Sequence, residues 1–190
     1  MDSQHVVVAI TGASGSIYGI KTLELLRGMQ NVETHLVITA SAKSTINIET
    51  DYSSLEIENL ADHVHGSRDI GASIASGSFQ TCGMIVAPCS IKSLSAIANS
   101  FGADLVSRAA DVTLKERRPL VLMVRETPFH LGHLRLMVKA TEMGAVVYPP
   151  IPAFYNKPDS IDDLIDHSVG RALEHLGFEI PTLKRWDGRN

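Results

Sequence analysis

The chain has 190 residues, of which 44% are hydrophobic and 5% aromatic. A chain of this size and composition buries enough apolar surface to fold around one core, which excludes a disordered protein and a disulfide-dependent scaffold. Its 17 Lys and Arg stand against 21 Asp and Glu, a formal net charge of −4, which excludes a general attraction to nucleic acid or anionic lipid. We therefore expect one domain over residues 1–190 that binds any anion through a local cluster.

Five short apolar runs rich in β-branched residues predict buried strands, and longer amphipathic stretches separate them. This alternation is typical of an α/β fold in which helices cover both faces of a parallel sheet. The predicted strands are Val6–Ile10, Thr34–Thr39, Met84–Pro88, Leu120–Val124 and Ala145–Tyr148.

The end of the chain carries the clearest helical periodicity. A helix is predicted between the cap Asp159-Ser160 and the stop Gly177. Its apolar stripe consists of Ile161, Leu164, Ile165, Val169, Ala172, Leu173 and Leu176. Four of the eight prolines fall within 149–158 beside Phe154 and Tyr155, which predicts a stiff, shaped loop before this helix.

Cysteine usage and the first residues indicate a cytoplasmic protein. Cys82 and Cys89 have neither the spacing of a CxxC redox pair nor that of half a zinc site, so two reduced thiols are expected. Cys89 is a candidate nucleophile by position alone, and a buried free thiol is the commoner case. The run Val6–Ile10 is too short for a signal sequence or a membrane span.

A glycine-rich loop follows the first predicted strand and opens a helix, which is a typical setting for a phosphate. Its glycines, Gly12, Gly15 and Gly19, depart from the G-x-G-x-x-G spacing of dinucleotide sites. The second strand ends in Thr39-Ala40-Ser41, where an NAD site would have an acid. The pattern favours a mononucleotide or a phosphate, and a plain strand-to-helix turn remains the alternative.

The third predicted strand leads into Ser90-Ile91-Lys92-Ser93, where hydroxyl groups at a helix start are also suited to a phosphate or a flavin edge. Five of the 17 basic residues lie within 18 positions, which indicates a local anion site or a solvated helix end. They are Arg108, Lys115, Arg117, Arg118 and Arg125. The helix-end interpretation is preferred for Arg117 and Arg118.

Four further positions are open between a functional and a structural role. Arg125 and Glu126 follow a buried strand, where parallel sheets bind ligands, so a functional role is favoured for them. Glu49 is either an acid or base or a helix-surface carboxylate, and Arg171 binds an anion or forms a surface salt bridge. The pair His130 and His133 is interpreted as structural because no third metal ligand stands out.

Eight segments together resemble the flavin prenyltransferase family, long described as aromatic acid or polyprenyl-hydroxybenzoate decarboxylase subunits. They are TGASG from Thr11, ETD at Glu49–Asp51, SGS at Ser76–Ser78, PCSIKSLSA from Pro88, RAADVTLKERRPLVL from Arg108, RETPF from Arg125, PAFYNKP from Pro152, and Arg185-Trp186. The resemblance spans nearly the whole chain, and the segments from Arg108 and Arg125 are the most specific. Thr39 stands where many members of the family have Ser, and Ser93 stands where many have Thr, so both positions keep a hydroxyl group.

The resemblance implies an enzyme that joins reduced FMN to the dimethylallyl group of dimethylallyl monophosphate. Bonds form at flavin N5 and C6, phosphate leaves, and a separate decarboxylase receives the prenylated FMN. The implied fold is a three-layer sandwich with a Rossmann-like or flavodoxin-like parallel sheet. A homododecamer with FMN between subunits and no required metal is also implied.

The same resemblance implies residue roles. The FMN-binding set is Gly12, Ala13, Ser14, Thr39, Ser90, Ile91, Lys92, Ser93 and Arg125. The set for the prenyl donor is Arg108, Lys115, Glu126, Tyr155, Arg171 and Trp186. The catalytic set is Ser14, Glu49, Lys115 and Glu126, with proton transfer as a hypothesis for the two carboxylates and Ser14.

Three other functions compete with this one. A flavin-dependent cysteine decarboxylase would share the fold, but Cys89-Ser90-Ile91-Lys92-Ser93 stands where that family has Pro-Ala-Ser-Ala-Asn-Thr. A non-catalytic FMN-binding subunit of a decarboxylase would lack turnover of its own. A short NAD(P) reductase is disfavoured by the glycine spacing.

Overall fold

A six-stranded, all-parallel sheet forms the centre of the molecule, in the order β3-β2-β1-β4-β5-β6. The structure is a computed structural model that describes residues 3–186 and 188. The strands are β1 Gln4–Ile10, β2 Val32–Ile38, β3 His63–Gly66, β4 Gly83–Cys89, β5 Leu120–Val124 and β6 Val146–Val147. The inner strands β1, β4 and β5 are almost wholly buried because helices cover both of their faces.

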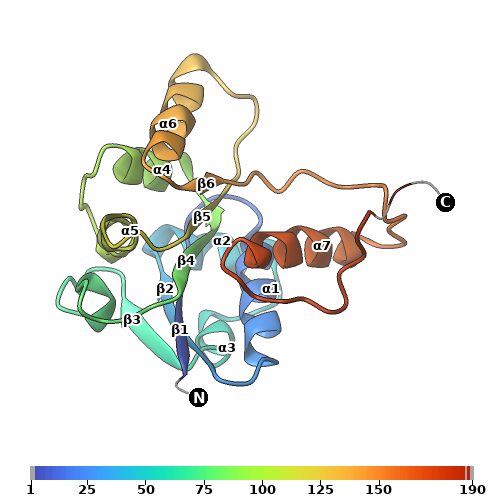
Figure 1. Cartoon of the computed structure of the whole chain (residues 1–190), viewed down its shortest axis with the longest axis horizontal. Helices are drawn as coiled ribbons and strands as arrows, with labels where there is room; N and C mark the ends of the chain where they lie inside the picture. Colours follow the sequence, from blue (N-terminus) through green and yellow to red (C-terminus); the bar gives the residue numbers. More distant parts are fainter. Residues whose placement is uncertain (1–2, 187, 189–190) are drawn as a thin grey trace.

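Helices form the two outer layers, as the sequence predicts (Figure 1). One face is covered by α1 Ser16–Arg27, α2 Ala40–Glu49, α3 Ser54–Glu58 and α7 Ile161–Glu174. The other is covered by the 3-10 turn η1 Ser73–Ala75, α4 Ile91–Ala98, α5 Leu105–Lys115 and α6 Leu131–Glu142. Each layer buries its own apolar cluster against the sheet, which accounts for the three-layer arrangement.

All five predicted strands are present, and one further strand was missed. The missed strand, β3, reads His63-Val64-His65-Gly66, which is short and polar because it forms the exposed edge of the sheet. The last predicted strand is shorter than expected, because only Val146 and Val147 pair with β5.

The C-terminal helix begins at its predicted cap, where the Ser160 hydroxyl accepts a hydrogen bond from Asp163 N–H. The predicted stripe is wrong at one position: Ile161 is 75% exposed, because the first turn extends past the apolar cluster. The segment from Tyr148 to Ser160 has no regular secondary structure and runs out beside α7 (Figure 1). Among the described residues, no helix has the length and apolar character needed to cross a membrane.

The strand order reverses its direction of growth between β1 and β4. From β1 the sheet continues to β2 and β3 on one side, whereas β4, β5 and β6 extend it on the other. Helices following neighbouring strands here turn to opposite faces and leave a crevice at the carboxyl ends of the strands. The candidate site is built at this edge.

Candidate active site

A buried hydroxyl joins β1 to β4 at the base of this crevice. The Thr11 hydroxyl donates to the carbonyl of Pro88 at 2.7 Å and accepts from the Ser90 N–H at 2.8 Å. Thr11 is 1% exposed, so these bonds are shielded from water. They fix the glycine-rich loop relative to the start of α4, a role for Thr11 that the sequence analysis did not assign.

The glycine-rich loop is held by Glu49 from the end of α2. One carboxylate oxygen of Glu49 accepts from the Gly15 N–H at 2.8 Å and the Ser16 N–H at 3.3 Å. The N-terminus of α1 therefore holds a carboxylate of the protein itself. This corrects the expectation that these N–H groups are free for a phosphate.

Glu49 and Ser14, both predicted to lie near the reacting flavin, are in contact. Burial favours the neutral form of Glu49, but hydrogen bonds from the Ser14 hydroxyl and the two N–H groups, with the charge of Arg125, lower the pKa of its carboxyl below the ordinary value. Burial raises the pKa of Tyr18, against the opposing charge of Arg125. Ser14, Glu49 and Arg125 thus come together at one end of the crevice, as an ionised carboxylate beside a hydroxyl and a cation.

Gly12 is required here by close packing. A Cβ at Gly12 would lie 2.4 Å from Ser41 Oγ and 2.5 Å from Ser41 Cβ, closer than side chains approach. The loop backbone therefore lies directly against the first turn of α2, and Ala13 and Ser14 follow it at the rim of the crevice.

A cavity of about 400 Å³ lies beside the loop, where the N-termini of α2 and α4 converge. Thr39 caps α2 by accepting from the Ala42 N–H at 3.2 Å, and Ser90 caps α4 by accepting from the Ser93 N–H at 3.3 Å. The cavity is lined by Thr39, Ala40, Ser41, Ser67, Arg68, Ser90, Lys92, Ser93, Ala103 and Asp104. Two helix N-termini, hydroxyl groups and two cationic side chains make this cavity suited to a phosphate.

Four of the residues predicted to bind FMN, Thr39, Ser90, Lys92 and Ser93, line this cavity. Ser41 belongs to the segment that the sequence analysis judged suited to a phosphate, whereas Ser67 and Arg68 were not singled out. Ile91 belongs to the same segment, but its side chain packs against the apolar cluster under α4. Ser67 and Arg68 follow β3, the strand that the hydrophobic pattern did not reveal. Because β3 was not predicted, the position of these two residues at the cavity could not be predicted from the sequence either.

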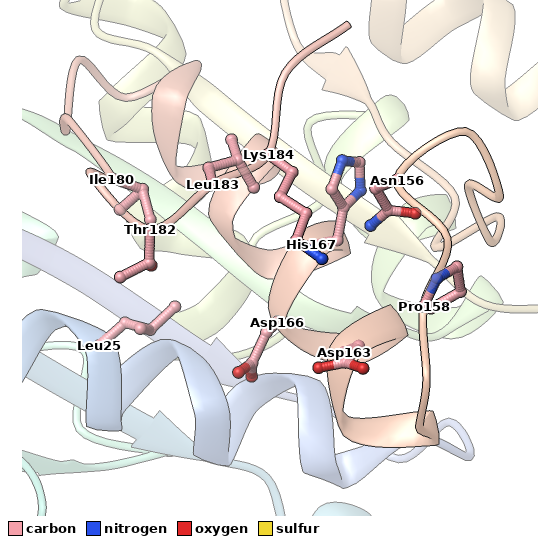
Figure 2. A pocket seen from close by; sticks show the side chains of 10 residues that line it. All are labelled: Leu25, Asn156, Pro158, Asp163, Asp166, His167, Ile180, Thr182, Leu183 and Lys184. Carbon is pink, nitrogen blue, oxygen red and sulfur yellow. The ribbon is translucent and has the colours of Figure 1, made fainter.

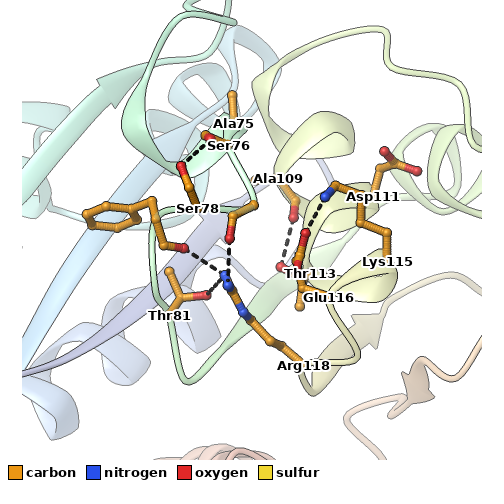
Figure 3. A network of polar contacts seen from close by, with 12 residues as sticks. Ala75, Ser76, Ser78, Thr81, Ala109, Asp111, Thr113, Lys115, Glu116 and Arg118 are labelled. Atoms are coloured by element: carbon orange, nitrogen blue, oxygen red, sulfur yellow. Dashed lines mark hydrogen bonds and ion pairs between the residues drawn. The ribbon is translucent and has the colours of Figure 1, made fainter.

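Two of the residues predicted to bind the prenyl donor belong to α5: Arg108 lies in its first turn and Lys115 is its last residue. Lys115 forms an ion pair with Glu116 (Figure 3). Arg108 pairs with Asp111 at 2.9 Å and donates to the Ala75 carbonyl at 3.2 Å. Since α5 leads directly into β5, Lys115 lies near the amino end of that strand. This is the edge of the sheet opposite the crevice.

A second group lies beside α7. The Tyr155 hydroxyl is 2.9 Å from His167 Nε2. The Tyr155 and Trp186 rings pack edge to face, with their centroids 6.2 Å apart. Arg171 forms an ion pair with Glu174. His167 also lines a cavity of about 230 Å³ between α1, α7 and the terminal segment (Figure 2).

One copy of the chain does not gather the predicted donor residues. Lys115 and Arg108 belong to the helical layer on one face of the sheet, and Arg171 to the layer on the other. Glu126 accepts from the Thr127 N–H at 2.9 Å, and within the described residues no ion pair joins it to a predicted cation. The expectation of one phosphate cluster therefore requires more than one copy of the chain.

The remaining candidates have structural surroundings. Burial raises the pKa of the Cys89 thiol to about 12, the opposite of what a nucleophile requires. His130 caps α6 by accepting from the Gly132 N–H, which agrees with its structural interpretation. Across residues 3–186 and 188, no three His, Cys, Asp or Glu side chains are arranged to hold a metal ion.

Comparisons with known proteins agree with this architecture. The family model named Flavoprotein matches residues 1–172. The chain is 54% identical to flavin prenyltransferase UbiX of Escherichia coli strain K12, covering 97% of this chain and 99% of that protein. It is 58% identical to flavin prenyltransferase UbiX of Thauera aromatica, covering 97% of this chain and 94% of that protein.

Solved structures give the same result. The crystal structure of AnUbiX (PadA1) in complex with FMN and dimethylallyl pyrophosphate has a TM-score of 0.96, with 52% identity, 99% of this chain and 100% of that chain covered. The cysteine decarboxylase TvaF has a TM-score of 0.64 over 92% of this chain and 99% of that chain, but at 14% identity it shares the fold alone. With matches of this identity over nearly its whole length, the chain belongs to the flavin prenyltransferase family.

Proposed function

We propose that this enzyme joins reduced FMN to the dimethylallyl group of dimethylallyl monophosphate and releases phosphate. Bound reduced flavin supplies the nucleophilic N5 and C6 atoms. We infer that residues 1–190 act as one unit in the cytoplasm and that a separate decarboxylase receives the prenylated FMN. The observation that carries the proposal is the hydroxyl-lined cavity beside the Ser14, Glu49 and Arg125 group.

The cavity fits the phosphate of FMN. Thr39, Ser41, Ser90 and Ser93 present hydroxyl groups to it, and both helix dipoles place positive potential there. Arg68 lines the same cavity, where a guanidinium would add a charge-assisted hydrogen bond to the phosphate. Gly12 lets the loop pack directly against Ser41, which lines this cavity.

The other end of the crevice suits the reacting edge of the flavin. Glu49 is held ionised by three hydrogen bonds, and the Ser14 hydroxyl among them joins it to the loop rim. In this arrangement Glu49 accepts a proton through Ser14, and Arg125 keeps the carboxylate charged beforehand. The group therefore removes a proton at the flavin edge without loss of loop structure.

The donor phosphate needs fixed cations, because negative charge grows on the departing oxygens as the allylic bond breaks. Lys115 and Arg108 from one copy, with Tyr155 and Arg171 from another, would supply them. Glu126 would exchange a proton with the phosphate, and Trp186 would exclude water from the allylic group.

Assembly supports this composite arrangement. A dodecameric FMN-dependent UbiX-like decarboxylase of Escherichia coli O157:H7 has a TM-score of 0.95, with 48% identity, 97% of this chain and 100% of that chain covered. We propose that this chain also forms a dodecamer, with FMN and the donor bound between subunits. Opposite faces of the sheet then contribute to one site.

The decisive experiment is anaerobic incubation of the purified full chain with reduced FMN and dimethylallyl monophosphate, followed by mass spectrometry of the flavin. We expect the flavin to gain one C5H8 unit, and Lys115→Met and Glu126→Gln to abolish or strongly slow this gain. Arg117→Asn removes a neighbouring charge and is the matched control. Tightly bound but unmodified FMN would instead favour a non-catalytic flavin-binding subunit.

The phosphate cavity has its own test. Riboflavin lacks the phosphate of FMN, so the ratio of the two dissociation constants measures the cavity alone. We expect Arg68→Gln to weaken FMN binding about tenfold and to leave riboflavin binding unchanged. Equal affinity of the wild type for the two flavins would contradict the assignment of the cavity.

A further inference from the structure

Arg118 fixes the segment that precedes β4. Its Nη1 donates to the Phe79 carbonyl at 2.8 Å and the Thr81 hydroxyl at 3.3 Å, and its Nη2 donates to the Gly77 carbonyl at 2.8 Å (Figure 3). The side chain is half-buried. The planar guanidinium group donates to three acceptors within residues 77–81, and these bonds together fix the conformation of that segment. The interpretation of Arg118 as a solvated helix end is therefore wrong.

The segment fixed by Arg118 lies directly against Lys115. A Cβ on Gly77 would lie 2.6 Å from Lys115 Nζ and 2.1 Å from Glu116 Oε1. The ammonium group therefore lies over the bare backbone of the turn, and a side chain at position 77 would displace it. The Ser76 and Ser78 hydroxyls, 2.9 Å apart, flank the same point.

Glu116 lies between two cations in this arrangement. It forms an ion pair with Lys115, and the hydrogen bond and charge of Lys115, with the charge of Arg118, lower the pKa of its carboxyl. An anion that binds Lys115 takes the place of this carboxylate. Arg118 remains beside Glu116 and limits the cost of releasing it.

A lysine at the end of a helix does not hold its charge in place by itself. Its four-carbon stem has many rotamers, and a contact gains strength when the turn beneath restricts them. Arg108 secures the start of the same segment through the Ala75 carbonyl, and Arg118 secures the rest. Both arginines thus act on one turn beneath one ammonium group.

We propose that Arg118 is a positioning residue for Lys115: it holds the Gly77 turn as a seat for the ammonium group, with Glu116 as the counter-ion that the donor phosphate displaces. This inference rests on the proposed role of Lys115 in binding dimethylallyl monophosphate. Arg118 itself does not touch the donor.

The test measures binding without turnover. Protein loaded with oxidised FMN cannot transfer the prenyl group, so calorimetry gives the dissociation constant of dimethylallyl monophosphate directly. We expect Arg118→Met to raise this constant about tenfold and to leave the FMN dissociation constant within about twofold. Arg117→Asn is the matched control, since it removes a charge one residue away at a left-handed position that Asn tolerates.

A double-mutant cycle separates positioning from general structural damage. If Arg118 acts through Lys115, then Lys115→Met weakens donor binding less in the Arg118→Met protein than in the wild type. Gly77→Ala perturbs the same contact without changing Arg118, and its backbone is not left-handed, so it serves if Arg118→Met does not fold. We expect a comparable loss of donor affinity from it.

Two results would overturn the inference alone. One is a strong effect of Lys115→Met together with donor affinity in Arg118→Met and Gly77→Ala equal to that of the Arg117→Asn control. The other is full additivity of the two methionine substitutions. If Lys115→Met itself leaves donor binding unchanged, the proposed donor site fails first, and this inference fails with it.

Discussion

Ionisable groups are held in opposite charge states at the carboxyl edge of the sheet, where the strands end, and at its amino edge, where they begin. At the carboxyl edge, Glu49 is charged and accepts hydrogen bonds from Gly15 and Ser16. At the amino edge, His35 is 4% exposed and lies between His65, at 3.0 Å, and His5, at 3.1 Å. Burial, with the charges of His63, His65 and His5, lowers the pKa of His35 to about 4, so this side chain is neutral near pH 7.

The difference follows from the direction of the helices. In a parallel α/β fold the helix N-termini lie at the carboxyl edge, so free N–H groups and positive dipole ends gather there. The helix C-termini lie at the amino edge and present carbonyls, so an anion there needs cationic side chains such as Lys115. In the proposed function, the FMN phosphate and the donor phosphate would therefore be bound by different chemistry.

The largest expected effect concerns the charge at the carboxyl edge. Glu49→Gln keeps the shape of the side chain but removes the proton acceptor, so we expect turnover to fall about 100-fold or more. FMN affinity should change little, because the phosphate cavity is untouched. Single-turnover rates with reduced FMN measure the effect, and an unchanged rate at saturating donor would contradict the proton-transfer role.

The next effect concerns the neutral group at the amino edge. The folded pKa of His35 is about 4 and its ordinary value is 6.5, so the unfolded chain binds the extra proton first. The stabilising contribution is complete above pH 6.5 and is lost as the pH falls toward 4. We expect a loss of about 2 to 3 kcal/mol in the free energy of unfolding over this window.

Urea titrations between pH 8 and pH 4 measure this loss. His35→Gln removes the titrating group and should flatten the curve between pH 6.5 and 4. Glu49→Gln is the matched control, since a lowered carboxyl pKa acts only below about pH 4.5. A curve of unchanged slope in His35→Gln would show that other groups carry the acid sensitivity.

A smaller effect tests the rigidity of the crevice. Thr11→Val removes the buried hydroxyl between Pro88 and Ser90. The Ser90 N–H then has no acceptor, and the Pro88 carbonyl keeps only the longer bond from the Thr11 N–H, at 3.3 Å. We expect a loss of about 1 to 3 kcal/mol in the free energy of unfolding. Thr22→Val, whose buried hydroxyl bonds only the Tyr18 carbonyl one turn earlier, should lose less than half as much. Equal losses would mean that Thr11 does not join the strands.

The smallest expected change in stability comes from Glu33, a carboxylate at the amino edge that serves as the counterpart of Glu49. Glu33 is paired with His5 and His63 and has no helix N-terminus beside it. We expect Glu33→Gln to leave the free energy of unfolding almost unchanged, because ion pairs between exposed side chains contribute little. Urea titration at pH 7 measures this, and a loss as large as that of Thr11→Val would show that the Glu33 contacts are structurally important.

The sequence by itself determined the fold class and supplied the candidate site residues. Buried strands covered on both faces must be almost entirely apolar, so β1, β4 and β5 were readable as continuous runs. The cap at Ser160 was readable because a cap needs only the residues within its own turn. Long motifs such as the segment from Arg108 then indicated the family.

The tertiary structure alone decided which groups meet. The edge strand β3 carries no apolar signal, so the meeting of His35 with His65 and the place of Arg68 beside Thr39 were hidden in the sequence. Glu49 and Gly15 are 34 residues apart, and Arg118 and Gly77 are 41 apart. Such contacts depend on how strands and helices are ordered across the sheet, and local residue patterns do not encode that order.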